Sequence, residues 1–162
     1  MKLKFFLPFL ALMAVSSAFM SCSDDNDGDN NAVSSADPLM LESFVLDGME
    51  ESTITRSGVG VDFPDSVKFL VYFQNNGLPQ GDHKYDIGVA LYNTNNQRIK
   101  TYALYDTIPC TYGKSYKMDD KIQLSKDLSN GTYLLKPICK VIGDKEWKDM
   151  KLADDFALSI TI

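Results

Sequence analysis

Apolar and polar residues alternate along most of the chain after Met40, so that every second position is apolar. A period of two is typical of a β-strand with one buried face, whereas an amphipathic helix has a period near 3.6. In the clearest segment, residues 67–74, the apolar positions are Val67, Phe69, Val71 and Phe73. The same pattern predicts further strands at Met40–Leu46, Ser52–Arg56, Tyr85–Leu91, Gln97–Tyr105, Tyr116–Leu124, Thr132–Ile142 and Phe156–Ile162.

Three places conflict with simple alternation. Asp120 falls on the apolar side of its strand, which predicts a bulge or a strand end nearby. Pro137 lies inside a strand that is apolar on both faces, but proline has no N–H to donate to a neighbouring strand. We therefore expect a bulge or an edge at Pro137. The segment from Gly143 to Asp154 has no clear pattern and is compatible with one helical turn.

Turn signals separate the predicted strands, among them Asn75-Asn76-Gly77, Asn93–Asn96 and Asn130-Gly131. Short strands at this spacing, with no convincing helix between them, are typical of two packed antiparallel sheets. The sequence therefore predicts an all-β domain, an immunoglobulin-like antiparallel β-sandwich of about seven or eight strands.

The first 21 residues have the three parts of a secretory signal peptide. Lys2 and Lys4 supply the positive start, an apolar run follows from Phe5 to Val15, and small residues come next. The run is shorter than the roughly 20 apolar residues that a membrane-spanning helix needs. A buried core helix is the alternative, and the acidic segment that follows directly argues against it.

The segment around Cys22 resembles the lipobox of bacterial lipoproteins, in which cleavage precedes a cysteine whose sulfur is diacylated. Ser21 fits the position before the cysteine, whereas Phe19 and Met20 depart from the usual pattern. The resemblance implies that residues 1–21 are removed and that Cys22 carries fatty acyl chains such as palmitate. Two or more chains anchor a protein stably in a membrane where one does not. Cleavage without lipidation stays open as an alternative.

A short acidic stretch stands directly behind this cysteine and includes Ser23, Asp24, Asp25 and Asp27. It resembles the surface-export signal of Bacteroidetes lipoproteins. The resemblance implies a protein that is lipid-anchored in the outer membrane and exposed on the cell surface. A solvated acidic spacer is the alternative, which leaves a periplasmic orientation open. A calcium-binding loop is disfavoured because no glutamate closes it at the required spacing.

Composition separates a stalk from a domain. Residues 22–37 are almost wholly small or polar and bury too little apolar surface to offset their ordering entropy. We expect them to form a flexible acidic stalk, and residues 38–162 to form one domain. The domain has 14 Lys and Arg against 17 Asp and Glu, with no basic block. This argues against nucleic acid as a partner.

The C-terminal part of the domain carries a third resemblance. Gly131–Lys140, followed by Gly143 and Trp147, resembles immunoglobulin-like modules of Bacteroidetes surface proteins, some of which accompany streptopain-like cysteine proteases. Tyr133 also resembles the tyrosine of the tyrosine corner in immunoglobulin-like sandwiches. The resemblance implies a structural module and brings no catalytic site with it.

Few residues offer chemistry. His83 is the single histidine, and a Cys–His pair with Cys110 or Cys139 is conceivable on residue types alone. A buried structural thiol is the favoured interpretation of Cys139. A disulfide between Cys110 and Cys139 and two separate buried thiols both stay open. Adjacent acids on a strand point to opposite faces, so no acid pair is predicted to be catalytic. We predict no catalytic site, metal or cofactor.

Loop and strand-end aromatics are the better candidates for ligand contact, namely Tyr102, Tyr105, Tyr112 and Trp147. The alternative is that most of them pack against the core. Ser66 and Thr107 each follow an aspartate and precede an apolar residue, which resembles the O-glycosylation motif of exported Bacteroidetes proteins.

These features favour a non-catalytic surface lipoprotein that binds a glycan or a protein. An inhibitor or accessory domain of a secreted cysteine protease is the first alternative, suggested by the resemblance to protease-associated modules. A small hydrolase that uses Cys110 or Cys139 is the second.

Overall fold

The computed structural model describes residues 36–47, 53–55, 66–125 and 127–161. The chain divides into two compact units, Met1–Ala32 and Val33–Ile162, and all described residues belong to the second. The predicted signal peptide, Cys22 and the export signal lie outside the described residues. Within the described residues, no helix has the length and apolar character to span a bilayer.

The described residues form nine strands and no helix. The strands are β1 (Met40–Leu46), β2 (Thr53–Thr55), β3 (Ser66–Gln74), β4 (His83–Asn93), β5 (Arg98–Cys110), β6 (Ser115–Gln123), β7 (Thr132–Val141), β8 (Lys148–Asp149) and β9 (Leu158–Thr161). One sheet has the order β1-β3-β6, and the other has the order β2-β9-β7-β4-β5 with β8 beside β7. All pairs are antiparallel except β2 and β9.

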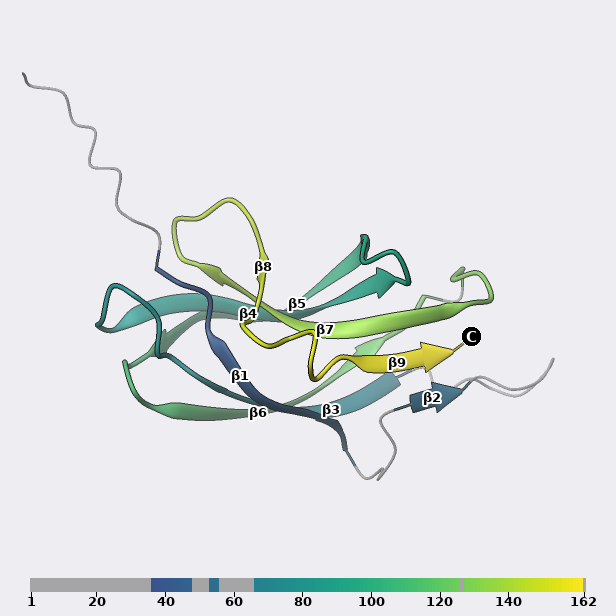
Figure 1. The fold of residues 1–162 in the computed structure, drawn as a ribbon, viewed down its shortest axis with the longest axis horizontal. Coiled ribbons are helices and arrows are strands. Elements are labelled where there is room, and N and C mark those ends of the chain that lie inside the picture. Colours follow the sequence, from purple (N-terminus) through teal and green to yellow (C-terminus); the bar gives the residue numbers. More distant parts are fainter. Residues whose placement is uncertain (1–35, 48–52, 56–65, 126, 162) are drawn as a thin grey trace, which may run out of the picture. The chain divides into compact units, whose positions relative to one another are not determined.

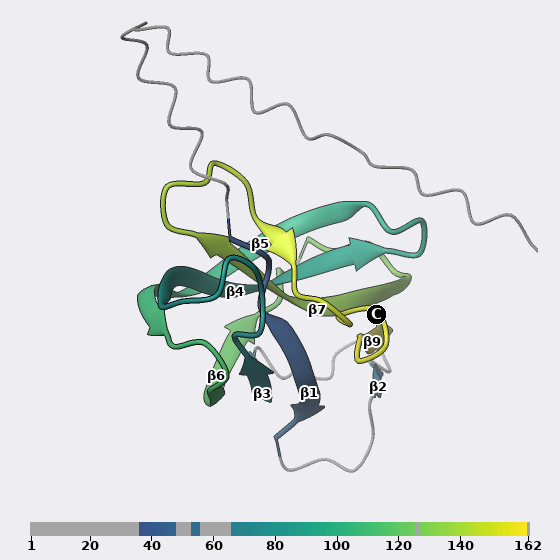
Figure 2. The same ribbon diagram turned by 60° about the vertical axis from the view of Figure 1, so that its left-hand side comes forward.

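The two sheets lie face to face (Figures 1 and 2). The apolar positions of the alternating pattern meet between them, among them Phe69 and Phe73 from β3, Ile87 and Val89 from β4 and Leu135 from β7. Each of these side chains is at most 2% exposed. The domain is thus an immunoglobulin-like β-sandwich, which confirms the predicted fold class.

A tyrosine corner is present at the turn before β7, as the resemblance of Tyr133 to the tyrosine of such corners implied. The Tyr133 hydroxyl donates to the Ser129 carbonyl over 2.8 Å, four residues upstream. A tyrosine near the start of a strand that bonds back in this way is typical of immunoglobulin-like sandwiches.

Of the two features predicted near Asp120, the bulge is absent, and the strand end comes three residues later, at Gln123. β3 and β6 pair without a register shift, and Asp120 lies opposite Phe69 on the inner side of the sheet. Asp120 is only partly buried, and its carboxylate accepts the N–H of Lys121 over 2.7 Å. Because the carboxylate stays in contact with water, the strand does not need a bulge to keep this charge out of the core.

Pro137 also lies in an unbroken ladder, opposite Val89 of β4. In an antiparallel strand the N and C=O of one residue point to the same side, and the Pro137 carbonyl accepts from Met150 over 3.1 Å, away from β4. On that side β9 pairs up to Leu135 and β8 begins at Ile138. The predicted bulge is wrong, and the missing N–H falls in the gap between two short partner strands.

Two boundaries also differ from expectation. The segment after β7 has turns and the two-residue strand β8 in place of a helical turn. Ala36 and Asp37, predicted to belong to the stalk, are part of the packed domain. Ala36 is 4% exposed, and the Asp37 carbonyl accepts the Tyr85 hydroxyl over 3.0 Å.

Candidate functional site

The outer face of the six-stranded sheet carries a second, smaller cluster of packed side chains. It consists of Ala90, Tyr92 and Ile138, with Leu134 and Trp147 packed against them. These residues alternate along β4 and β7 with residues of the main core, so they lie on the opposite face of the sheet. The segment from β7 to β8 rises on this outer side in Figure 1.

Arg98 connects three strands across this face. Its Nε donates to the Tyr92 hydroxyl over 2.8 Å, its Nη1 to the Trp147 carbonyl over 3.0 Å, and its Nη2 to Asp149 over 2.9 Å. The Tyr92 hydroxyl in turn donates to the same oxygen of Asp149. One guanidinium thus fixes β5, β4 and β8 relative to one another, as its rigid fork of donors allows.

Tyr92 remains a neutral phenol in this arrangement. Burial raises the pKa of Tyr92 to about 12, and its hydrogen bond to Asp149 adds to the rise against the opposing effect of Arg98. A neutral phenol can both accept from Arg98 and donate to Asp149. The three side chains therefore form a closed hydrogen-bonded set.

Beneath this set lies a buried ammonium group. Lys136 is 1% exposed, and its Nζ donates to Asn96 and Asp154. The same nitrogen lies 4.6 Å from the centre of the Tyr92 ring, within cation–π range. Lys136 therefore holds the β4–β5 turn and the segment before β9 against the sheet.

Trp147 lies beside a second cation. The Lys140 ammonium is 5.4 Å from the centre of the indole ring and 2.9 Å from Asp86. Burial opposes ionisation of Asp86, but the hydrogen bonds from Lys140 and the Thr107 N–H outweigh it and lower the pKa of Asp86. Lys140 is thus anchored as a cation beside the half-buried ring.

We call the residues Tyr92, Arg98, Lys140, Trp147 and Asp149 the outer platform. Arg98 and Asp149 keep 31% and 34% of their side chains exposed. The platform therefore offers water-facing hydrogen-bond donors and acceptors beside an aromatic ring, all held by contacts within the domain. Fixed polar groups next to an apolar surface are the usual composition of a ligand site.

The structure does not bring the four predicted contact aromatics together. Tyr102 and Tyr105 pack against the main core, and the Tyr105 hydroxyl donates to the Asp119 carbonyl over 3.0 Å. Tyr112 is 38% exposed after β5, where its hydroxyl accepts from Gln80. Trp147 is the one member of the four that lies on the outer platform.

Tyr92, Arg98 and Asp149 were not predicted as site residues from the sequence. Tyr92 looked like an ordinary strand residue, because β4 is buried on both faces and its alternation is hidden. The nearest signal was the run of apolar residues on both faces of β7, which indicates a strand covered on both sides.

The two cysteines are separate buried thiols, so the structure corrects the candidate disulfide. Cys110 is on β5 and Cys139 is on β7, with β4 between them. Strands are spaced about 4.8 Å apart, so two steps place the backbones about 10 Å apart. A disulfide needs Cα atoms within about 7 Å.

Neither thiol has the environment of a nucleophile. Burial raises the pKa of Cys110 to about 11 and that of Cys139 to about 12, whereas a reactive thiol needs a lowered pKa. His83 is the register partner of Cys110, but its Nε2 lies 2.8 Å from the Pro79 carbonyl.

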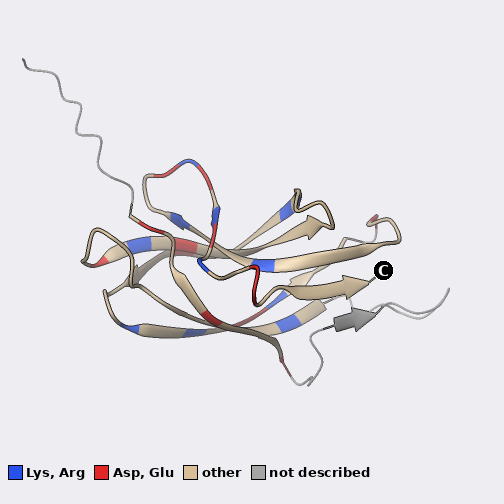
Figure 3. Ribbon diagram, viewed as in Figure 1, with Lys and Arg blue, Asp and Glu red and all other residues tan. Residues whose placement is uncertain are grey.

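The two candidate glycosylation residues lie in different settings. Ser66 is the first residue of β3, and Thr107 is exposed in β5 with a φ of 57°. In the part of the chain that the structure describes, no group of three or more His, Cys, Asp or Glu could hold a metal ion. Acidic and basic residues are interspersed over both sheets (Figure 3).

No protein-family model matches the chain, and no curated protein matches it. Among solved structures, the chain is similar to the crystal structure of the C-terminal domain of Wzt. The TM-score is 0.45 at 13% sequence identity, over 79% of this chain and 74% of that chain. A likeness of this size says nothing about a ligand.

Proposed function

We propose that this chain is a non-catalytic surface lipoprotein whose β-sandwich binds a glycan on the outer platform. The observation that carries the proposal is the fixed arrangement of Arg98 and Asp149 beside Trp147. A sugar offers hydroxyl groups that donate to a carboxylate and accept from a guanidinium, and C–H faces that pack on an aromatic ring. The platform holds all three kinds of group on one face of one sheet.

Preorganisation supports a binding role. Arg98 and Asp149 are already bonded to each other and to Tyr92, so little side-chain entropy is lost when a ligand arrives. If Cys22 is lipidated and Ser23–Asp27 acts as an export signal, the domain would meet ligands outside the cell.

The proposal is tested by a glycan array probed with the full chain in detergent, followed by titration of the best hit. We expect Trp147→Ala to weaken binding at least tenfold, which is about 1.4 kcal/mol, because the ring supplies the stacking surface. Arg98→Lys should also weaken it, since lysine cannot reproduce the fork of donors. Tyr112→Ala is the matched control, because Tyr112 is an exposed aromatic away from the platform.

Unchanged binding by Trp147→Ala would contradict the platform as the site. The array could instead show no glycan ligand while the chain captures a protein partner. If Trp147→Ala abolishes that capture, the outer platform is still the binding site, and its ligand is a protein. Thermal unfolding of each variant separates lost contacts from lost folding.

A further inference from the structure

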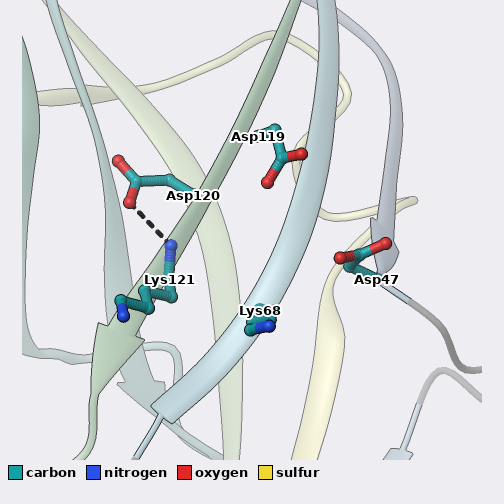
Figure 4. A pocket seen from close by; sticks show the side chains of 5 residues that line it. All are labelled: Asp47, Lys68, Asp119, Asp120 and Lys121. Atoms are coloured by element: carbon teal, nitrogen blue, oxygen red, sulfur yellow. Dashed lines mark hydrogen bonds between the residues drawn. The ribbon is translucent and has the colours of Figure 1, made fainter.

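The three-stranded sheet has its own hollow, on the side of the sandwich away from the outer platform. It has a volume of about 350 Å³ and is lined by Asp47, Lys68, Asp119, Asp120 and Lys121 (Figure 4). Lys68, Asp119 and Lys121 alternate with core residues along β3 and β6, so they point outward. Asp120 points to the other side of β6 and borders the hollow from the edge.

Two lysines from adjacent strands line this hollow. Lys68 of β3 and Lys121 of β6 are direct cross-strand partners on the outer face. Like charges directly opposite each other destabilise a sheet. Among the described residues neither lysine forms an ion pair. A single anionic group between the two ammoniums would accept charge-assisted hydrogen bonds from both.

Two carboxylates flank the lysines. Asp47 continues the pairing of β1 with β3, since its N–H donates to the Lys68 carbonyl over 3.0 Å. Figure 4 shows Asp47 and Asp119 on either side of β3, with Lys68 between them. Carboxylates in these places repel a ligand that is uniformly anionic but accept hydrogen bonds from hydroxyl groups. The hollow therefore suits a molecule with one anionic group and hydroxyl groups around it.

We propose that this hollow is a second binding site and that it takes the carboxylate of an acidic sugar. Lys68 and Lys121 hold the carboxylate, and Asp47 and Asp119 accept from the neighbouring hydroxyls. The volume is near the lower end of the range for ligand sites, about 300–1,000 Å³, which fits one sugar unit. The site lies on the other sheet and does not depend on the outer platform.

The test is a titration of the full chain, labelled with ¹⁵N, with three probes: glucuronate, glucose and inorganic sulfate. We expect glucuronate to shift the amide signals of Lys68 and Lys121, and glucose at the same concentration to leave them unchanged. Lys68→Gln and Lys121→Gln should each weaken glucuronate binding about tenfold. Lys117→Gln is the matched control, because Lys117 lies on the same face of β6 outside the hollow and contacts the Tyr72 ring.

Absence of glucuronate shifts at Lys68 and Lys121 would overturn the site. If glucose binds as tightly as glucuronate, the proposed role of the lysines is wrong. If sulfate binds as tightly as glucuronate, the proposed role of the hydroxyl-accepting aspartates is wrong. Asp47→Asn tests that second role directly, since it keeps the shape of the side chain, and it should weaken glucuronate more than sulfate. Trp147→Ala should leave this titration unchanged, so failure here is distinguishable from failure at the outer platform.

Discussion

Lys136 is the least expected single residue of the domain. Lysine is rarely buried without a partner, and this side chain has a carboxylate, an amide oxygen and an aromatic ring around its ammonium. Asp154 is 76% exposed, so water screens the ion pair and limits its contribution to stability. The main effect of Lys136 is to position the chain segments that border the outer platform.

Cys110 and Cys139 give a prediction at the same scale. Both should resist a thiol reagent such as DTNB at pH 8 in the native protein, because burial raises their pKa values to about 11 and about 12. Unfolding in guanidinium should expose both, since they are free thiols. The measurement is the absorbance of released thionitrobenzoate, with Cys110→Ser and Cys139→Ser to assign each thiol.

Two outcomes would contradict this picture. No gain of thiols on unfolding would indicate a disulfide, and rapid reaction of native Cys110 would indicate an activated nucleophile. The second outcome would favour the hydrolase alternative.

At the scale of elements, β5 explains why the predicted aromatics do not form one surface. Tyr102 lies opposite Val89 and Tyr105 lies opposite Ile87, with a register shift between the two pairs. Three residues apart, they would point to opposite faces of a regular strand, but the extra residue turns both toward the core. Alternation along the sequence cannot reveal a bulge that depends on the partner strand.

Gly88 gives a prediction for the same pair of strands. A Cβ at Gly88 would overlap the Tyr102 carbonyl oxygen of β5, which is backbone and cannot move alone. Gly88→Ala should therefore lower the free energy of unfolding by about 1–3 kcal/mol, as overpacking does in well-packed interiors. Urea denaturation followed by circular dichroism measures this change.

Gly131→Ala is the matched control for Gly88→Ala. A Cβ at Gly131 meets only the Tyr133 ring, at 3.9 Å, which is ordinary contact. Equal stability of the Gly88→Ala variant and the unsubstituted protein would show that β4 and β5 are further apart than the structure has them.

At the scale of the whole molecule, the start of the described chain closes one side of the sandwich. The Leu41 N–H donates to the Lys151 carbonyl over 3.0 Å, and the Lys151 N–H donates to the Leu39 carbonyl over 2.9 Å. The Lys151 ammonium also pairs with Asp37 over 2.8 Å. The start of the described domain is thus fixed to the segment between β8 and β9.

The anchor gives the prediction at this scale. Cells that express the full chain should incorporate radiolabelled palmitate into it, and the protein should fractionate with the outer membrane. Cys22→Ser should abolish both results, because the acylated sulfur is the predicted anchor. Cys139→Ser should change neither. Soluble, unlabelled wild-type protein would contradict lipidation and favour ordinary signal-peptide cleavage.

The sequence by itself determined the fold class and most of the strands. A period of two needs only local geometry, so β1 matches its predicted bounds, and the tyrosine corner follows from one tyrosine behind a turn. The predicted signals for export and lipidation also rest on short stretches of sequence alone.

Only the tertiary structure decided which side chains meet. Arg98 and Asp149 are 51 residues apart and are joined through Tyr92 on a strand between them. Lys68 and Lys121 are neighbours because of the register between β3 and β6. A shift of one residue in either strand would turn its lysine toward the core. Pairing between distant strands depends on the packing of the whole sandwich, and for that reason the sequence offered Trp147 alone of the outer platform and none of the hollow.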